Sequence, residues 1–406
     1  MAGGVPFALD GLKVVEVGGY AAGPWIGKVL GNYGATVVHV EAWDRPDGFR
    51  LQYPPYRDGK KGLNRSGCFS YFNDSKYAVT IDIKKPGGIE LSQRLANWAD
   101  VLVENMRPGV VDRIGLGYEE LKKINPDLIY VSTCNMGQTG PRAATGGFGS
   151  QLSALAGFCG LTGYPGGSPQ LLYGPYIDFV AALVGTPVIL AAVDRKRRTG
   201  QGAYIDVSQY ECGCTFLSGA LHDYHTTGHI VDRMGNQDPV AAPHNAYPCL
   251  NDEWLTLSCW DGGEFARLAK CIGQAAWASD KRFATAEARR ANAADLDQAI
   301  GKWSATQSAD GAVAALQAVQ VHSYKVNTVA DLFSDPQIAH RRTWRTRKHP
   351  EIGDQAYYYP GIELDERPGD VTSHAPLIGE HNELVFRDFL GLTDAEWKTY
   401  KDNGVI

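Results

Sequence analysis

Short apolar runs alternate along the first half of the chain with segments whose apolar residues recur every three to four positions. Residues 12–17 form a Val-rich run that ends at a Gly-Gly pair, and residues 23–30 follow with helical spacing. Pro24 suits the first turn of this helix, where its missing N–H costs nothing. Residues 35–40 are the next apolar run, so the segment is predicted to be a βαβ unit.

The same alternation continues as far as residue 226. Strands are predicted at residues 77–83, 100–104, 127–132 and 200–207, and helices at residues 86–98, 118–124, 178–198 and 208–226. Strands alternating with helices indicate an α/β fold with a Rossmann-like, doubly wound parallel sheet. Ligands of such sheets bind beyond the carboxyl ends of the strands, where this chain has loops at residues 105–109 and 135–141.

The composition changes after residue 226. A loop at residues 234–243 is followed by a strand at 254–258 and by short helices up to residue 319, predicted to break at Gly273 and Gly301. We therefore expect residues 1–225 to form the first part of a large domain. Residues 226–334 are expected to form a linker and a smaller α+β domain, and residues 335–406 to return and complete the large domain.

Composition and charge narrow the class of protein. The chain has 406 residues, 44% of them hydrophobic, and a net charge of −6 with scattered basic residues, which argues against a nucleic-acid or membrane partner. Residues 1–6 lack the basic and apolar regions of a signal peptide, and the apolar run 179–193 is shorter than the roughly 20 residues that span a bilayer. We expect a cytoplasmic protein.

Two kinds of bound group are disfavoured by spacing. Glu41 ends the second strand where a ribose-binding acid often lies, but the glycines of the preceding turn do not fit GxGxxG, which argues against NAD. The eight cysteines contain no CxxC pair. His222, His225 and His229 lack an HExxH pattern, so a polar linker helix is favoured over a metal site.

Motifs spread over nearly the whole chain resemble one family, the class III coenzyme A transferases of the CaiB/BaiF type, which also include acyl-CoA racemases. They are Gly23-Pro24, Gly34-Ala35, Lys76, Ile81-Asp82, residues 99–105 (ADVLVEN), Arg107-Pro-Gly109, 114–118 (IGLGY), 124–126 (INP), 137–141 (GQTGP), Asp178, 198–202 (RTGQG), 335–337 (DPQ) and 375–381 (APLIGEH).

The resemblance places Asp178 on the catalytic aspartate of this family. On its own pattern Asp178 is a helix N-cap before an apolar helix, and an Asp near its reference pKa of about 4 is ionised at pH 7. The family implies that this carboxylate attacks an acyl-CoA thioester, giving a mixed anhydride and then an aspartyl-CoA thioester. Coenzyme A is then a substrate, and no permanently bound cofactor is expected.

The resemblance also implies CoA-contacting positions in the first half of the chain. Two departures from the family stand out, because its well-known members carry Gln where Ala21 stands and Arg where Ala42 stands. Arg45, Arg50 or Lys76 are the candidates to supply the missing cation. The positions that match CoA contacts are Ala21, Ala22, Ile81, Asp82, Ile83, Lys84, Asn105, Met106, Arg107 and Arg113.

The substrate is expected to be larger than formate or oxalate. The glycine-rich flap of formyl-CoA transferase is replaced by residues 238–243 (DPVAAP), a stiffer and more apolar loop. Phe148, Tyr164, Tyr173 and Tyr176 are candidates for the site, although each of them could equally be a core residue. We expect a dicarboxylic or aromatic acid with succinyl-CoA as donor, with benzylsuccinate-type transferases as one candidate.

Three further expectations follow from the resemblance. An acyl-CoA racemase is the first alternative, but racemases of this family have a His and an Asp in the motif that aligns with residues 147–149, and both are absent here. A non-catalytic subunit of a heteromeric transferase is the second. The family also implies that the chain is an open ring that interlocks with a second ring, either an identical chain or a related subunit.

Overall fold

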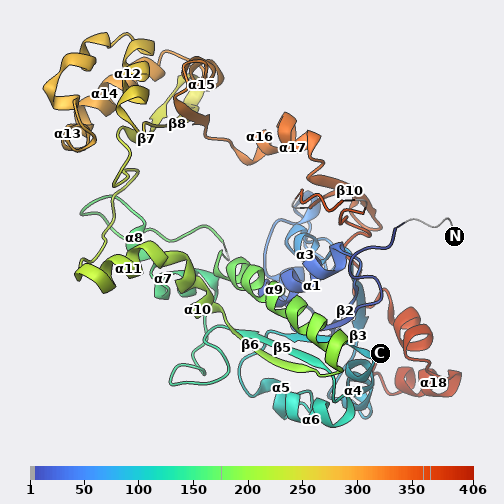
Figure 1. The fold of residues 1–406 in the computed structure, drawn as a ribbon. Coiled ribbons are helices and arrows are strands. Elements are labelled where there is room, and N and C mark those ends of the chain that lie inside the picture. The colour runs from blue at the N-terminus through green and yellow to red at the C-terminus, as the bar shows by residue number, and fades with distance from the viewer. Residues whose placement is uncertain (1–4, 175, 360, 366) are drawn as a thin grey trace. The chain divides into compact units, whose positions relative to one another are not determined.

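A six-stranded, wholly parallel sheet forms the centre of the large part of the structure (Figure 1). The strand order β3-β2-β1-β4-β5-β6 is that of a doubly wound sheet, with the order reversing between β1 and β4. This confirms the predicted parallel α/β architecture. The strands are β1 (Lys13–Val17), β2 (Thr36–Glu41), β3 (Tyr77–Thr80), β4 (Val101–Glu104), β5 (Ile129–Cys134) and β6 (Ala203–Ser208).

The computed structural model describes residues 5–174, 176–359, 361–365 and 367–406. Residues 1–4, part of the stretch judged unlike a signal peptide, and Pro175 lie outside it. The chain divides into two compact units: a large unit of Met1–Phe158, Leu171–Thr227 and Pro336–Ile406, and a small unit of Cys159–Gln170 and Gly228–Asp335.

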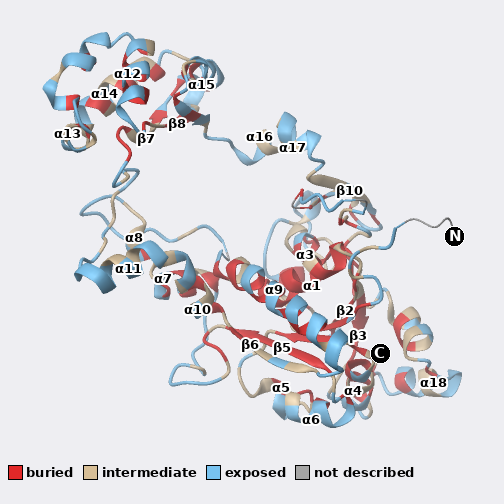
Figure 2. Ribbon diagram, viewed as in Figure 1, coloured by how far each residue is buried: buried red, intermediate tan, exposed pale blue. Residues whose placement is uncertain are grey.

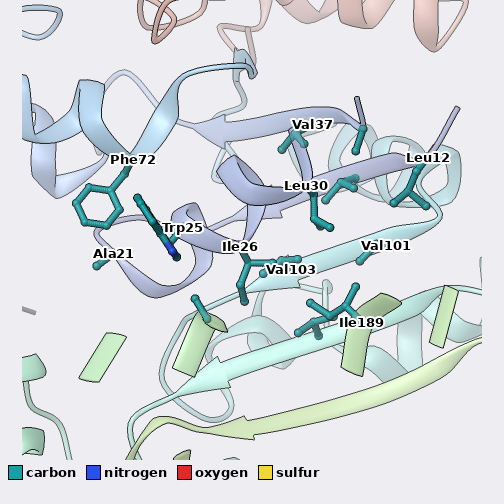
Figure 3. Close-up of a cluster of buried hydrophobic side chains, with 14 of the residues drawn as sticks. Leu12, Ala21, Trp25, Ile26, Leu30, Val37, Phe72, Val101, Val103 and Ile189 are labelled. Atoms are coloured by element: carbon teal, nitrogen blue, oxygen red, sulfur yellow. The ribbon is translucent and has the colours of Figure 1, made fainter. Parts of the chain in front are cut away.

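Strands β1 to β5 are largely buried on both faces, which explains why they read as apolar runs, whereas the edge strand β6 is partly exposed (Figure 2). On one face Val37, Val101 and Val103 pack against helices α1 (Ala22–Asn32) and α9 (Tyr176–Thr199), as the cluster in Figure 3 shows. On the other face the strands pack against α4 (Gly88–Trp98), α6 (Tyr118–Ile124) and the tail with α18 (Asp394–Asp402).

Helix α9 is the longest helix described, with 24 residues. Its C-terminus leads within a few residues to the start of β6, so its N-terminus lies toward the carboxyl edge of the sheet. By length and composition it is the one described helix that could cross a membrane, with mean hydropathy 2.0 over its most apolar window, and half of that window is buried inside the structure. The buried half packs as a core helix does.

The small unit has its own core beneath a three-stranded antiparallel sheet in the order β7-β8-β9. The predicted break at Gly273 is confirmed, because α12 ends at Cys271. The predicted break at Gly301 is wrong, since α14 runs through it and leaves open space where a Cβ would project. The elements are β7 (His244–Pro248), β8 (Trp254–Ser258), β9 (His322–Lys325), α12 (Gly262–Cys271), α13 (Ala286–Ala291), α14 (Ala293–Ser304), α15 (Ala309–Ala318) and α16 (Val329–Ser334).

Several elements of the large unit were not predicted from sequence. The predicted helix 208–226 is in fact three pieces, α10 (Gln209–Cys214), the 3-10 turn Thr215–Leu217 and α11 (Ser218–Thr227). The sequences that form helix α3 (Gly67–Asn73) and the hairpin of β10 (Trp344–His349) and β11 (Gly353–Tyr358) show no clear hydrophobic periodicity. The remaining elements of the large unit are α2 (Gly48–Leu51), α5 (Val110–Arg113), α7 (Gly149–Leu155) and α17 (Pro336–His340). Helix α8 (Phe158–Leu161) begins in the large unit and continues into the small one.

Candidate active site

A cavity of ≈ 470 Å³ opens at the carboxyl edge of the parallel sheet, where the strand order reverses. Its interior is apolar, with Val17, Leu95 and Leu102 among its walls, and its rim carries charged side chains. This position is the one expected for a ligand of a doubly wound sheet. Most of the lining residues follow β1, β2, β3 and β4: Gly18, Gly19, Tyr20, Ala42, Asp44, Arg45, Pro46, Asp47, Gly48, Gln52, Ile81, Asp82, Ile83, Lys84 and Met106.

The turn between β1 and α1 forms one wall of this cavity. Gly18 has φ 133°, which a residue with a side chain rarely adopts, and a Cβ there would collide with the Asn105 side chain. Asn105 Oδ1 accepts a hydrogen bond from Gly19 N at 3.1 Å, and Asn105 Nδ2 donates to Gly19 O at 2.6 Å. Asn105 therefore uses its amide to hold the turn.

The predicted CoA-contacting residues fall into two groups. Ile81, Asp82, Ile83, Lys84 and Met106 line the cavity. The other five predicted contacts do not line the cavity. Ala21 and Ala22 are buried at the start of α1, Asn105 is partly buried, and Arg107 and Arg113 are exposed.

The structure distinguishes among the three candidate cations. Arg50 is 0% exposed and its guanidinium pairs with Glu41 at 2.7 Å, while Lys76 is 2% exposed and pairs with Glu16 at 2.9 Å. Because both cations are buried and paired with acids inside the protein, neither is available to a ligand. Arg45 lies on the cavity rim and is exposed. Lys84, also on the rim, pairs with Asp44 at 2.7 Å.

Asp178 lies in the first turn of α9, one position after the buried Ile177. The helix begins at Tyr176, so Asp178 is inside the first turn and not at the N-cap that its sequence pattern predicted. Its neighbour Phe179 packs edge-on against Trp25 of α1 at 4.9 Å between ring centroids. Because the N-terminus of α9 lies toward the carboxyl edge of the sheet, Asp178 and the cavity lie toward the same edge.

The Asp178 carboxyl group is poorly solvated. Its Oδ2 atom is buried and has no hydrogen-bond partner. Burial raises the pKa of Asp178 to about 7, and only a hydrogen bond with its own backbone N–H opposes this. The expectation of an ordinary pKa near 4 is therefore wrong, because a desolvated carboxylate loses the water that stabilises its charge.

Glu104 is a second buried acid that sequence reasoning did not single out as functional. It ends β4, and its Oε2 accepts a hydrogen bond from Met106 N at 2.7 Å, which fixes the start of the loop at 105–109. Burial raises the pKa of Glu104 to about 7, although hydrogen bonds from Ser132 and Met106 oppose the shift. The signal in the sequence was an acid at the end of an otherwise apolar strand.

The predicted aromatic residues are dispersed. Phe148 packs edge-on against Tyr20, a cavity residue, at 5.9 Å. Tyr176 is exposed at the start of α9 and contacts Phe158, while Tyr173 is fully exposed. Tyr164 belongs to the small unit. None of the three large-unit aromatics is a fully buried core residue.

The loop at residues 238–243 is pinned within the small unit. Asp238 Oδ1 accepts hydrogen bonds from Val240 N at 2.7 Å and Ala241 N at 2.9 Å. Arg289 Nε donates to Ala242 O at 2.7 Å, so both ends of the apolar stretch are held. Among the described residues no group of three His, Cys, Asp or Glu side chains is arranged to hold a metal ion.

Comparison with known proteins assigns the chain to a family. It is 34% identical over 401 residues to the succinyl-CoA–D-citramalate CoA-transferase of Chloroflexus aurantiacus, covering 99% of this chain and 98% of that protein. It is 29% identical over 404 residues to the β subunit of the succinyl-CoA–L-malate CoA-transferase of the same organism, covering 98% of each. A crystal structure of a CaiB/BaiF family protein from Brucella suis matches with TM-score 0.87 and 32% identity, over 95% of this chain and 100% of that one. The model of CoA-transferase family III matches residues 9–382, and the chain belongs to that family.

Proposed function

We propose that this chain is a CoA-transferase that moves coenzyme A from an acyl-CoA thioester to a carboxylic acid, with Asp178 as nucleophile. The observation that carries the proposal is the Asp178 carboxyl group, whose Oδ2 is buried without a hydrogen-bond partner. Asp178 is not among the residues that line the cavity, but it lies toward the same edge of the sheet. A carboxylate that lacks water and hydrogen-bond donors is a stronger nucleophile than a solvated one.

The reaction follows from this group in four steps that keep the thioester energy. The Asp178 carboxylate attacks the donor thioester carbonyl, and the C–S bond breaks to give an aspartyl mixed anhydride and CoA thiolate. The thiolate attacks the aspartyl carbonyl, releasing the donor acid as its carboxylate and leaving an aspartyl-CoA thioester. The acceptor carboxylate attacks this thioester, giving a second mixed anhydride and CoA thiolate. The thiolate then attacks the acceptor carbonyl, which yields the new acyl-CoA and frees Asp178.

The cavity is the proposed binding place for part of the CoA molecule. Its volume lies within the range of roughly 300–1,000 Å³ usual for small-molecule sites. Its apolar interior suits a planar base or the pantetheine arm, and Arg45 and Lys84 on the rim suit phosphates. Ile81 to Lys84 and Met106 would form the wall. Contacts from Ala21, Ala22, Asn105, Arg107 and Arg113 stay predictions, and Asn105 is proposed to act by holding the glycine turn.

The proposed donor is succinyl-CoA and the proposed acceptor a dicarboxylic acid. Two relatives over the full length of the chain are named as succinyl-CoA-dependent transferases, with D-citramalate and L-malate as acceptors. An acid larger than formate stays a prediction from residues 238–243, which stand where the family has a glycine-rich flap. Benzylsuccinate-type acids are an aromatic variant of the same class. A panel of acyl-CoA donors and acids, read by mass spectrometry, would identify the pair.

We further propose that two chains interlock, as a homodimer or with a related subunit, in the cytoplasm. The outward side of α9 leaves four large apolar side chains exposed, a face that a second chain would cover. The relative named as a β subunit supports the heteromeric version. If the purified chain is dimeric but inactive until a homologous subunit is added, that version is right. These four α9 side chains are the exposed aliphatic residues Leu183, Val184, Val188 and Leu190.

The role of Asp178 is tested by trapping the covalent intermediate that it forms. Intact-mass analysis after acyl-CoA and hydroxylamine should reveal a hydroxamate on Asp178, and Asp178→Ala should lose both the adduct and CoA transfer. Asp194→Asn changes an exposed acid of the same helix and serves as the control. An active Asp178→Ala protein without any adduct would refute the proposal, and fast α-deuterium exchange into a 2-methylacyl-CoA would favour the racemase.

A further inference from the structure

Six ionisable side chains are buried in the large unit at and behind the cavity wall. All of them are at most 6% exposed. With the acids ionised and the bases protonated they carry three negative and three positive charges. Such a cluster is costly to bury unless every charge is paired. The six are Glu16, His39, Glu41, Asp47, Arg50 and Lys76.

Hydrogen bonds join the six side chains into two groups of three, and Glu41 and Asp47 of the second group reach the cavity. Lys76 Nζ donates to Glu16 at 2.9 Å, and His39 Nδ1 lies 2.6 Å from Glu16 Oε1. Arg50 pairs with Glu41 at 2.7 Å, and Glu41 Oε2 accepts a hydrogen bond from Asp47 N at 2.9 Å. Of these six side chains, Glu41 and Asp47 also line the cavity.

Asp47 holds the wall of the cavity through backbone groups. Its Oδ1 accepts hydrogen bonds from Tyr20 N at 3.1 Å and from Phe49 N at 2.8 Å, so one oxygen joins the glycine turn to the start of α2. Tyr20 has φ 64°, a left-handed conformation that is strained for a residue with a side chain. A Cβ on Gly19 would lie 2.9 Å from the Asp47 carboxyl carbon, so the carboxyl group packs directly on the turn.

The second oxygen of Asp47 faces His39 across an open gap. Asp47 Oδ2 and His39 Nε2 are 3.6 Å apart, within ion-pair range but too long for a hydrogen bond. Both atoms are buried and have no hydrogen-bond partner. His39 Nε2 is also 3.5 Å from Glu41 Oε1, so His39 lies between carboxylates on both sides.

Burial and the neighbouring charges shift the pKa of both members of this pair. Burial alone would lower the pKa of His39, but Glu16, Glu41 and Asp47 raise it above its ordinary value. Burial raises the pKa of Asp47 to about 6, with the His39 charge opposing and the Glu41 charge adding to the shift. Cys68 and Lys76 are the other titratable groups close enough to interact with Asp47.

We propose that Asp47 and His39 are positioning residues for coenzyme A, because the buried ion pair holds the Gly18–Tyr20 turn in the conformation that shapes the cavity wall. Ionised Asp47 accepts a charge-assisted hydrogen bond from Tyr20 N, and the His39 cation keeps Asp47 ionised. Protonation of Asp47 weakens that bond and loosens the strained turn. This inference rests on the proposed function, since it takes coenzyme A to be the ligand of the cavity.

The test compares Asp47→Asn with the unchanged protein by calorimetric titration with coenzyme A at pH 8 and pH 5. The amide mimics the protonated acid in size and shape. Binding to the variant should be about threefold to tenfold weaker at pH 8 and nearly equal at pH 5. Protonation of coenzyme A itself affects both proteins equally, so the ratio of their affinities at each pH does not depend on it. His39→Gln should move this convergence to higher pH, because Asp47 loses the cation that keeps it ionised.

Two controls keep the outcomes distinct. Asp261→Asn alters an aspartate that caps α12 in the small unit and should not change coenzyme A affinity at either pH. Circular dichroism establishes that each variant is folded. A folded Asp47→Asn protein whose affinity ratio is the same at both pH values overturns the inference. If the unchanged protein binds no coenzyme A at all, the proposed function fails instead.

Discussion

Replacing Asp178 with Asn should stabilise the protein at alkaline pH, because it removes a charge that the fold solvates poorly. Burial raises the pKa of Asp178 from 3.8 to about 7. Each pH unit of such a difference corresponds to about 1.4 kcal/mol, which gives an upper bound of about 4 kcal/mol. Since the residue is only half-buried, we expect about 2–4 kcal/mol.

The sign follows from proton binding. Between about pH 4 and pH 7 the folded protein keeps the Asp178 proton while the unfolded chain releases it, so stability from this group falls as pH rises. Above about pH 7 the Asp178 carboxyl group is ionised in both the folded and the unfolded state, so its full destabilising effect on the folded protein is present. The increase in the free energy of unfolding that Asp178→Asn produces should therefore be largest at pH 8.5 and several-fold smaller at pH 4.5.

Urea unfolding followed by circular dichroism at these two pH values measures the difference. Asp194→Asn is the matched control, because Asp194 lies on the same helix, is exposed and pairs with Arg198. The free energy of unfolding of Asp194→Asn should differ from that of the unchanged protein by the same amount at both pH values. An Asp178→Asn gain that does not depend on pH would refute the argument that the carboxylate is desolvated.

Three further predictions follow from the same site and helix. The rate of Asp178 acylation in single-turnover experiments should rise with pH through about 7 and then level off, and a flat profile from pH 5 to 9 would contradict the raised pKa. Arg45→Ala should raise KM for acyl-CoA about threefold to tenfold with little change in kcat, whereas Lys123→Ala, an exposed lysine of α6, should leave KM unchanged. Leu183→Glu should give monomers in light scattering if the exposed face of α9 contacts a second chain, and Ile124→Glu, an equally apolar exposed position on α6, should not.

Long periodic segments were predictable because their pattern is local. The apolar runs of the parallel strands and the helical spacing of α1, α4 and α6 appear in the sequence as they do in the structure. Helix α3 was missed because its buried aromatic residues, Phe69 and Phe72, lie in a short, mixed segment. Gly301 was taken as a helix end, yet the packing of Ile300 and Leu296 carries the helix through it.

The site was predictable only in part. Motifs placed Asp178 and the segment at 81–84, and that segment does line the cavity. Ala21 and Ala22 were expected at the cofactor but are buried in the start of α1. The roles of these residues, and an independently folding small domain, stay predictions.

By itself the sequence determined the alternation of strands and helices, the family motifs and the presence of an acid near the start of a long apolar helix. Only the tertiary structure decided which charges are available to a ligand. Arg50 is paired inside the fold with Glu41, nine residues earlier, and Lys76 with Glu16, 60 residues earlier, which leaves Arg45 at the cavity rim. It also decided the pKa of Asp178, since solvation depends on what other segments pack around a carboxyl group, and neighbours along the chain do not specify that.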